Sequence, residues 1–458
     1  MPNFRNIERT RQTSVRISIF TALASVHPTH SKPIANASGI NLQHKDSLEN
    51  KMLHHMRLVA RSAAKLAAIA ALGLALTAGV SHADAGFRNW VENFRASASR
   101  SGISDATFRA AFAGVNDIDS EVLEKARSQP EFKSPVWDYF DNRVHERSVA
   151  NGQAQLKKLK PWLDKIEQRF GVSRNILLAI WSMETNYGEI LKRPEVVRST
   201  IRSLATLAYA DKRRAKFART QLIAALKILQ RGDVSVAELQ GSWAGAMGHT
   251  QFIPTSFIAY GVDIDGNGRR DIWNSVPDAL ATSANLLAKN GWQSGRTWGY
   301  EVRLPAGKLP SGSLSLAKWQ SLGVTRANGK PFSSPSDAAT LKLPGGRSGP
   351  AFLMLRNFSV IKRYNNAEKY ALAVAVLADR IGGGGGFAND FDRPFTPLSI
   401  TEKEELQRSL SGLGYYDGKS DGNIGPATKA SILAFQAAEG LTADGYASME
   451  LLRHLRSK

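Results

Sequence analysis

The sequence predicts a mainly α-helical protein of the α+β class, divided into at least two folded domains. Apolar residues recur at helical spacing over long stretches, and strand-like segments are confined to residues 291–350, which are rich in Gly, Ser and Pro. Five consecutive glycines at 382–386 then interrupt the helical pattern. At about 150 residues per domain, a chain of 458 residues has room for two or three domains.

The composition limits the classes of function. Sixty Lys and Arg against forty Asp and Glu give a net charge of +20, which indicates a polyanionic partner: nucleic acid, an anionic membrane or an acidic polymer. A hydrophobic share of 43% excludes a mostly disordered chain and a polytopic membrane protein. Cysteine is absent, which excludes disulfides, Cys-ligated metals, a Cys nucleophile and a lipid anchor on an N-terminal Cys.

The first 85 residues have the features of an export signal. Residues 1–51 show no sustained period, and we expect an untranslated or disordered extension there. Basic residues then precede an apolar run at 66–78 and a small-x-small site, which predicts a signal peptide at 52–85 with translation starting at Met52 or Met56. An uncleaved anchor or a buried helix is the alternative, but a membrane span needs about 20 apolar residues.

Removal of this segment changes the charge and histidine content of the mature chain. Residues 1–83 contain ten Lys and Arg and three Asp and Glu, so they carry +7 of the net charge and leave +13. They also contain six of the nine histidines. Only His145, His249 and His454 remain, far apart in the sequence, so we do not expect a histidine-rich metal site.

Helices are predicted from residue 86 to about residue 170, and the most informative helix follows at 173–187. Ser173 is a suitable N-cap, and residues 176–181 are apolar almost all round, as in a helix buried inside a domain. Glu184 lies in this helix, where burial would raise the pKa of its carboxyl group and make it a general acid at neutral pH. The helix alone leaves open that Glu184 is paired with an arginine or faces solvent.

The segment 239–256 has the composition of a ligand-binding loop. It combines three glycines and two alanines with polar groups such as Gln251, and small residues let the backbone approach a ligand closely. A phosphate loop is excluded, because the segment lacks Gly-Lys-Ser/Thr and a preceding strand pattern.

These two segments resemble the B-type lytic murein transglycosylases, which are goose-lysozyme-like enzymes that cleave bacterial peptidoglycan. The resemblance is carried by Glu184-Thr185 with Tyr187-Gly188, and by Gly245-Ala246-Met247-Gly248 with Gln251-Phe252 and Pro254. It covers about residues 86–386. It implies a lysozyme-like catalytic domain at 86–381 with a small β/loop subdomain.

The resemblance also implies roles for individual residues. Glu184 would be the catalytic acid and base, and Ser242 and Gln251 would bind sugar near it. The other residues that it places on the glycan are Arg213, Arg214, Phe217, Tyr364, Asn365 and Tyr370. Phe217 stands where the best-known member has Tyr, so a ring is kept and a hydroxyl lost. For Phe217 and Tyr370, packing in the core is the alternative.

The implied reaction needs one carboxyl group. Ordinary glycosidases use two, whereas here Glu189 and Glu195 lie in a charged segment and are expected to face solvent. Glu184 would protonate the β-1,4 oxygen between N-acetylmuramic acid and N-acetylglucosamine, and then deprotonate the muramic acid C6 hydroxyl to close a 1,6-anhydro ring. A hydrolytic muramidase and a non-catalytic peptidoglycan-binding protein are the alternatives.

Residues 263–271 match the start of an EF-hand calcium loop. Oxygen ligands at positions 1, 3 and 5, Gly266 at position 6 and a backbone carbonyl at position 7 fit that pattern, but position 12 is Asn274 instead of Glu. A plain Asp/Gly turn fits the residues equally well. The resemblance favours a weak structural Ca²⁺ site that closes with a late Asp, with Asp271 as another possible ligand; the predicted ligands are Asp263, Asp265, Asn267, Arg269 and Asp278. No cofactor is expected to be required for the reaction.

The C-terminal part forms a second predicted domain. A helix is predicted at 367–380, and the glycine run begins a proline-bearing linker at 382–397. In residues 398–458, helices alternate with the Asp-Gly turns at Asp421 and Asp444. This arrangement resembles the three-helix peptidoglycan-binding domain at the ends of many cell-wall hydrolases, and would tether the enzyme to its substrate.

These observations together predict a periplasmic, soluble, monomeric enzyme that binds peptidoglycan glycan strands. No basic stripe interleaved with aromatic residues is present in the sequence, so nucleic acid is not an expected partner. The absence of Cys and the cleaved signal predict that no stable membrane anchor remains. The sequence leaves open exo- or endo-action, protein partners and the preference for peptide-bearing or denuded glycan.

Overall fold

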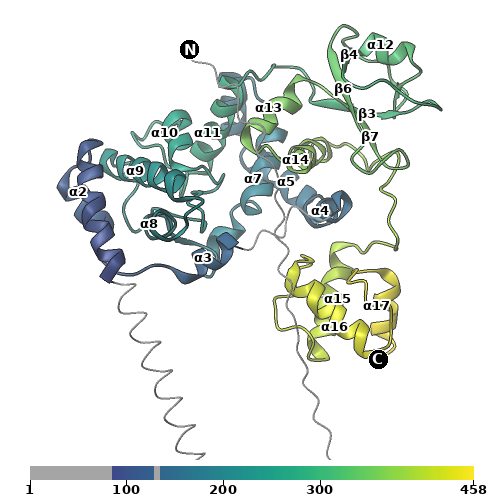
Figure 1. Cartoon of the computed structure of the whole chain (residues 1–458). Helices are drawn as coiled ribbons and strands as arrows, with labels where there is room; N and C mark the ends of the chain where they lie inside the picture. Colours follow the sequence, from purple (N-terminus) through teal and green to yellow (C-terminus); the bar gives the residue numbers. More distant parts are fainter. Residues whose placement is uncertain (1–84, 128–134) are drawn as a thin grey trace, which may run out of the picture. The chain divides into compact units, whose positions relative to one another are not determined.

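The computed structural model describes residues 85–127 and 135–458 (Figure 1). The predictions of an extension at 1–51 and of a signal peptide at 52–85 lie outside these residues, apart from residue 85. The described residues belong to one compact unit. No helix within them is long and apolar enough to cross a membrane.

Helices form the N-terminal part of the fold. Residues 85–100 are helical. The next helices are α2 (Asp105–Phe112), α3 (Ser120–Arg127), α4 (Val136–Arg143), α5 (Glu146–Lys158), α6 (Lys160–Phe170) and α7 (Arg174–Thr185). Local signals set several boundaries. The Ser104 hydroxyl accepts a hydrogen bond from Thr107 N at the start of α2, and Gly171 ends α6 in the left-handed conformation with φ 67°.

The middle of the chain continues this helical domain. Its elements are η2 (Glu189–Lys192), β1 (Arg198–Ser199), α8 (Thr200–Ala210), α9 (Ala215–Arg231), β2 (Gln240–Gly241), α10 (Pro254–Tyr260) and α11 (Val276–Lys289). Strands β1 and β2 form a small antiparallel pair. Helix α7 lies in the core of this domain, where its residues from Ile176 to Met183 are buried.

A five-stranded antiparallel sheet with one short helix interrupts the helices (Figure 1). Its strand order is β4-β6-β7-β3-β5, and its own core packs around the fully buried Trp319. The elements are β3 (Gly299–Arg303), β4 (Ser313–Ser315), α12 (Leu316–Ser321), β5 (Thr325–Arg326), β6 (Ala338–Lys342) and β7 (Ala351–Met354). The sequence prediction of a small strand and loop subdomain at 291–350 is confirmed, and β7 extends it by a few residues.

Two helices after the sheet return to the helical core: α13 (Arg356–Tyr364) and α14 (Glu368–Ile381). The C-terminal domain follows with α15 (Ile400–Gly412), α16 (Pro426–Ala438) and α17 (Met449–Arg456) around a separate apolar core. The buried Gln407 accepts a hydrogen bond from Gly422 N at 2.7 Å, and Gln436 accepts one from Gly445 N at 2.9 Å. One buried glutamine thus holds each of the two Asp-Gly turns. The predicted fold class, a mainly helical α+β protein with a small β subdomain and a three-helix C-terminal domain, is confirmed.

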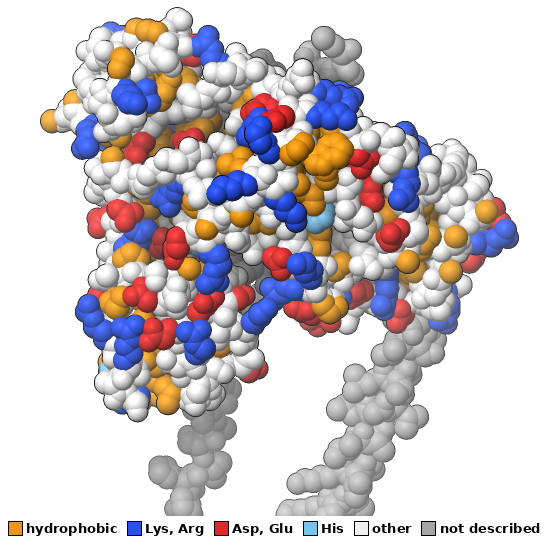
Figure 2. All heavy atoms as spheres, turned by 180° about the vertical axis from the view of Figure 1, so that it is seen from behind, with side chains coloured by type: hydrophobic (Ala, Val, Ile, Leu, Met, Phe, Trp, Pro, Cys, Tyr) orange, Lys and Arg blue, Asp and Glu red, His pale blue; other side chains and the backbone are white. Residues whose placement is uncertain are grey.

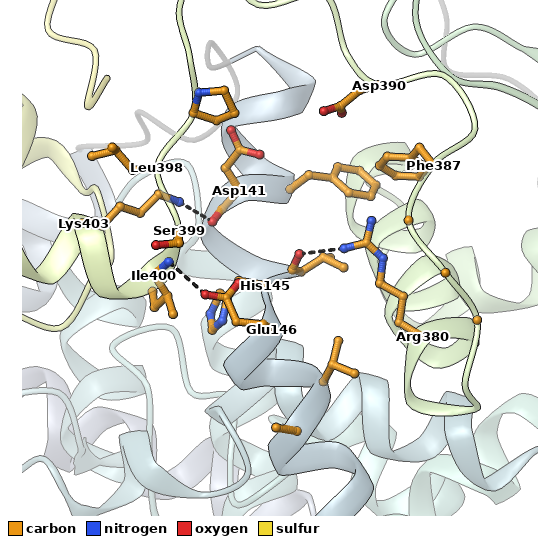
Figure 3. Close-up of a pocket in the computed structure, with 18 of the residues that line it drawn as sticks. Asp141, His145, Glu146, Arg380, Phe387, Asp390, Leu398, Ser399, Ile400 and Lys403 are labelled. Carbon is orange, nitrogen blue, oxygen red and sulfur yellow. Dashed lines mark hydrogen bonds between the residues drawn. The ribbon is translucent and has the colours of Figure 1, made fainter. Parts of the chain in front are cut away.

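The linker and the C-terminal domain contact helices α4 and α5 (Figure 3). Lys403 Nζ donates to Asp141 O at 2.6 Å, and Ile400 N donates to Glu146 Oε1 at 3.1 Å. These residues line the cavity that Figure 3 shows, and on its opposite side Arg380 donates to Val144 O at 3.2 Å. These bonds connect the end of α14 and the start of α15 to the region of α4 and α5.

Candidate active site

Helix α7 positions Glu184 one residue before its C-terminal end. The predicted cap at Ser173 is only partly right: Ser173 occupies the N-cap position, but its side chain makes no capping hydrogen bond. Glu167 accepts the hydrogen bond from Arg174 N instead, at 3.1 Å. The helix ends at Thr185, so the predicted end at Tyr187 is two residues too long. Asn186, Tyr187 and Gly188 all have positive φ and turn the chain away directly after Glu184.

The carboxyl group of Glu184 is removed from water by the surrounding protein, although the residue as a whole keeps some exposure. This burial raises its pKa to about 7. Two groups act in the opposite direction. The Tyr370 hydroxyl donates a hydrogen bond to Glu184 Oε1 at 2.5 Å, and the positive charge of Arg143 on α4 also favours the carboxylate. Both protonation states of Glu184 are therefore accessible near neutral pH.

The two tyrosines of the late segment lie at this site. Tyr370, on α14, is 5% exposed and donates a hydrogen bond to Glu184. The sequence offered core packing or sugar contact as the role of Tyr370, and neither includes this hydrogen bond. The Tyr364 hydroxyl donates to Thr250 O at 2.5 Å and lies 3.3 Å from Ser283 Oγ. Burial and the nearby charge of Glu184 raise the pKa of both tyrosines well above its ordinary value. Both hydroxyls therefore stay protonated donors.

The loop 240–256 folds back on itself beside α7. Met247 pairs with Gly241 and with Phe252, and Gly248 lies so close to Ile272 O that a side chain would not fit. Ser242 is half-buried, and its hydroxyl accepts a hydrogen bond from Ala246 N at 3.2 Å. Gln251 has a positive φ of 51°, and its side chain donates to Gly248 O at 2.9 Å.

His249 joins this loop to α7, a connection that sequence analysis missed. Thr185 Oγ1 donates to His249 O at 2.6 Å, and Trp181 Nε1 donates to His249 Nδ1 at 3.2 Å. Burial lowers the pKa of His249 to about 4, which keeps the ring neutral and able to accept. Neither sequence distance nor periodicity indicates that residues 181 and 249 meet.

The other predicted sugar-binding residues lie on exposed or half-buried surfaces. Phe217 on α9 is 45% exposed, so the alternative prediction that its side chain packs in the core is wrong. Arg214 forms a 2.8 Å ion pair with Asp211 and lies over the Trp243 ring at 5.7 Å, beside Ser242 in sequence. Arg213 is exposed and donates to Ala126 O at 3.4 Å. Asn365 is exposed at the end of α13, where its side chain accepts from Ala367 N.

Three carboxylates of the predicted calcium loop lie together. Ligand oxygens of Asp263, Asp265 and Asp278 are within 4.8 Å of one another. Burial, with a smaller contribution from the two neighbouring carboxylates, raises the pKa of Asp278, and a bound cation would relieve that repulsion. The Asn267 side chain accepts from Arg269 N at 2.9 Å, while Asp271 accepts from Trp273 N and Asn274 N. The acidic cluster could hold a hard cation through oxygen ligands.

The helical domain, with one desolvated acid at the end of its central helix, defines a glycan-cleaving enzyme of the lysozyme-like class. The family described as "Transglycosylase SLT domain" matches residues 86–379, and "Putative peptidoglycan binding domain" matches residues 401–455. The chain belongs to the transglycosylase SLT domain family, as a lytic transglycosylase acting on peptidoglycan.

Individual relatives agree with this assignment. The chain is 30% identical over 268 residues to "Membrane-bound lytic murein transglycosylase B" of Escherichia coli (strain K12), which covers 58% of this chain and 72% of that protein. It is 47% identical to SltB3 from Pseudomonas aeruginosa in complex with NAG-anhNAM-pentapeptide, with a TM-score of 0.64 over 81% of this chain and 99% of that one. Escherichia coli Slt35 in complex with calcium is 25% identical, with a TM-score of 0.53 over 65% of this chain and 92% of that one.

Proposed function

We propose that this chain cleaves the β-1,4 bond between N-acetylmuramic acid and N-acetylglucosamine with Glu184 as the only catalytic carboxyl group. The observation that carries the proposal is the raised Glu184 pKa of about 7 together with the hydrogen bond from Tyr370. The raised pKa keeps a proton available for the leaving oxygen at neutral pH. The tyrosine then stabilises the carboxylate that remains.

The reaction would proceed in two proton transfers. Protonated Glu184 gives its proton to the glycosidic oxygen as the bond to muramic acid C1 breaks. The Glu184 carboxylate then removes the proton from the muramic acid C6 hydroxyl, whose oxygen bonds to C1 and closes the 1,6-anhydro ring. Glu184 ends protonated, as it began, and no water is consumed.

The neighbouring carboxylates support this single-acid mechanism over a two-carboxylate one. Glu189 is exposed and paired with Lys192 at 2.7 Å, and Glu195 is exposed and paired with Arg193 at 2.9 Å. Neither has the desolvated surroundings of Glu184. A hydrolytic muramidase, in which water takes the place of the C6 hydroxyl, is the alternative outcome.

The remaining predicted residues would hold the glycan and the fold. Exposed Phe217 offers a ring face for a sugar, and Arg213, Arg214, Ser242, Gln251, Tyr364 and Asn365 offer polar contacts. Asp263, Asp265 and Asp278 would bind a structural Ca²⁺, with further oxygens from Asn267 and the Arg269 carbonyl. The C-terminal domain would bind the wall in the periplasm. On the face shown in Figure 2, Lys and Arg side chains are interspersed with Asp and Glu, so the positive charge there forms no continuous stripe of the kind that nucleic acid requires.

Mass spectrometry of digested sacculi tests the proposal. Muropeptides ending in 1,6-anhydromuramic acid are expected, whereas reducing muramic acid ends would show a muramidase. Glu184→Gln should lower the rate by about a thousandfold or more, because an amide cannot donate the proton. The matched control Glu92→Gln removes an exposed carboxylate of the first helix, outside the site, and should keep the wild-type products and rate.

A further inference from the structure

A second cavity, of about 490 Å³, lies where the C-terminal domain meets the segments around the catalytic acid. Its lining comes from four places: the α4–α5 region, the segment from the end of α7 through η2, the start of α15, and the turn at residues 419–423 of the C-terminal domain. It is therefore built by both domains of the chain.

The cavity has an excess of positive charge. Five cationic side chains line it, namely Arg143, Arg147, Lys192, Arg193 and Lys419, against three acidic ones, Glu189, Glu404 and Asp421. Two of the acids are already used by cations of the same cavity, because Glu404 pairs with Arg147 and Glu189 pairs with Lys192. Asp421 accepts a hydrogen bond from Asn423 N at 2.9 Å.

Two cations remain free for a ligand. Within residues 85–127 and 135–458, the side chains of Arg143 and Lys419 make neither an ion pair nor a hydrogen bond, and both residues are exposed. One comes from α4 of the catalytic domain and the other from the C-terminal domain, so a ligand that bridges them would contact both domains. Arg193, the only other cation without a partner inside the cavity, pairs with Glu195 outside its lining.

The cavity is connected to the catalytic acid through Arg143 and the end of α7. Arg143 lines it and is also the cation whose charge acts on the Glu184 carboxyl group. Ser182 and Asn186 line it too, two residues before and after Glu184 in the chain. The cavity therefore shares Arg143 and the end of α7 with the site of Glu184.

Contacts between the domains hold the two halves of the cavity together. Ile424 N donates to Asn142 Oδ1 at 3.0 Å, and Lys429 pairs with Asp138 at 2.8 Å. The neighbouring cavity in Figure 3 differs in this respect, because its cations serve the protein itself: Lys403 bonds Asp141 O, Arg380 bonds Val144 O and Arg393 pairs with Asp141. The two free cations therefore distinguish the cavity beside Glu184.

We propose that this cavity binds the carboxylates of the peptide that muramic acid carries, with Arg143 and Lys419 as the two contacts. The inference rests on the proposed function, since cleavage next to muramic acid brings the lactyl-linked stem peptide close to Glu184. The peptide carries several carboxylates, which match a pair of unpartnered cations, and its amides match Asn186 and Ser420 at the same cavity. The enzyme would therefore prefer peptide-bearing over denuded glycan.

Calorimetric titration in the Glu184→Gln background tests the site without turnover. The probes are NAG-NAM-pentapeptide and the same disaccharide without peptide. The double variant Arg143→Gln/Lys419→Gln should bind the pentapeptide ligand at least about tenfold more weakly, because two charge-assisted contacts are lost. Its affinity for the peptide-free disaccharide should change by less than about twofold. An equal loss of affinity for both probes, or no loss for either, would contradict the proposed peptide-binding site.

Three further variants keep the test decisive. Arg143→Lys/Lys419→Arg retains both charges and should bind the pentapeptide ligand nearly as well as the parent. Arg88→Gln/Lys308→Gln removes two exposed, unpaired charges outside the cavity and should leave both affinities unchanged. The single variant Lys419→Gln changes only the C-terminal domain and must weaken pentapeptide binding by itself. The proposed function has its own test. If wild-type digests lack anhydro ends while the double variant still loses affinity for the pentapeptide ligand alone, the proposed function is wrong and the peptide site stands.

Discussion

The hydroxyl of Tyr370 donates a 2.5 Å hydrogen bond to Oε1 of Glu184 across 186 residues of sequence. This bond favours the charged form of Glu184 and so opposes the burial that raises its pKa. Tyr370→Phe should therefore raise the Glu184 pKa further. A hydrogen bond to a charged group contributes about 1.5–3 kcal/mol, so the basic limb of the pH–rate profile should move about one to two units upward.

The measurement is the rate of sacculus solubilisation from about pH 5 to about pH 10. Tyr415→Phe, in the C-terminal domain, is the matched control and should keep the wild-type profile. A basic limb that stays in place, or moves to lower pH, in Tyr370→Phe would show that the bond does not set the Glu184 pKa.

Two partly buried histidines predict a loss of stability in acid. Burial lowers the pKa of both His145 and His249 to about 4, below the ordinary value of 6.5. The unfolded chain therefore binds more protons than the folded chain between these values, and stability falls as the pH decreases through this range. At pH 5 each histidine costs about 2 kcal/mol relative to neutral pH.

His145→Asn isolates one of the two histidines. His145 caps α5 by accepting from Ser148 N through Nδ1, a role that Asn can fill without titrating. The variant should lose about 2 kcal/mol less than the wild type between about pH 7 and pH 5. Urea unfolding at both pH values measures this difference. His145→Ala should be less stable at both values yet show the same reduced pH dependence, and a wild-type dependence in either variant would contradict the assignment.

The position of Glu184 was predictable because its helix is apolar almost all round. Such a pattern favours a desolvated carboxyl group near its end, but the helix alone left pairing with an arginine and exposure to solvent open, and the match of the segment 239–256 to a known family decided between them. The β subdomain and the C-terminal helices were predictable for a similar reason, since glycine and proline separate segments of different period. These features depend on neighbours within a few residues of the chain.

The partners of Glu184 were not predictable in this way. Tyr370 reaches it because α14 packs against α7, and Arg143 because α4 lies nearby, and neither packing leaves a periodic signal in the sequence. Ser173 was correctly predicted at the N-cap position of α7. Its side chain nevertheless makes no capping hydrogen bond, because Glu167 accepts the hydrogen bond from Arg174 N. Side chains that meet through tertiary packing require the structure.

The C-terminal domain should retain the enzyme on its insoluble substrate. A chain truncated after residue 390 should be recovered with sedimented sacculi much less than the full chain, by about tenfold or more, because binding through the second domain is lost. Rates on a short soluble glycan without peptide should change far less. Equal sedimentation of both chains would contradict the tether.

Calcium binding should depend on the acidic cluster and be weak. Three carboxylates within 4.8 Å, without Glu at position 12, predict a Kd of about 10⁻⁴–10⁻³ M for Ca²⁺. Asp265→Asn should abolish the heat of Ca²⁺ titration and the rise in Tm that Ca²⁺ produces, while its amide oxygen can still accept from Asn267 N. The control Asp417→Asn, an exposed carboxylate of the C-terminal domain, should titrate like the wild type. No heat from chelator-treated wild-type protein would exclude the site, because the cluster would then be stabilised by its own backbone hydrogen bonds alone.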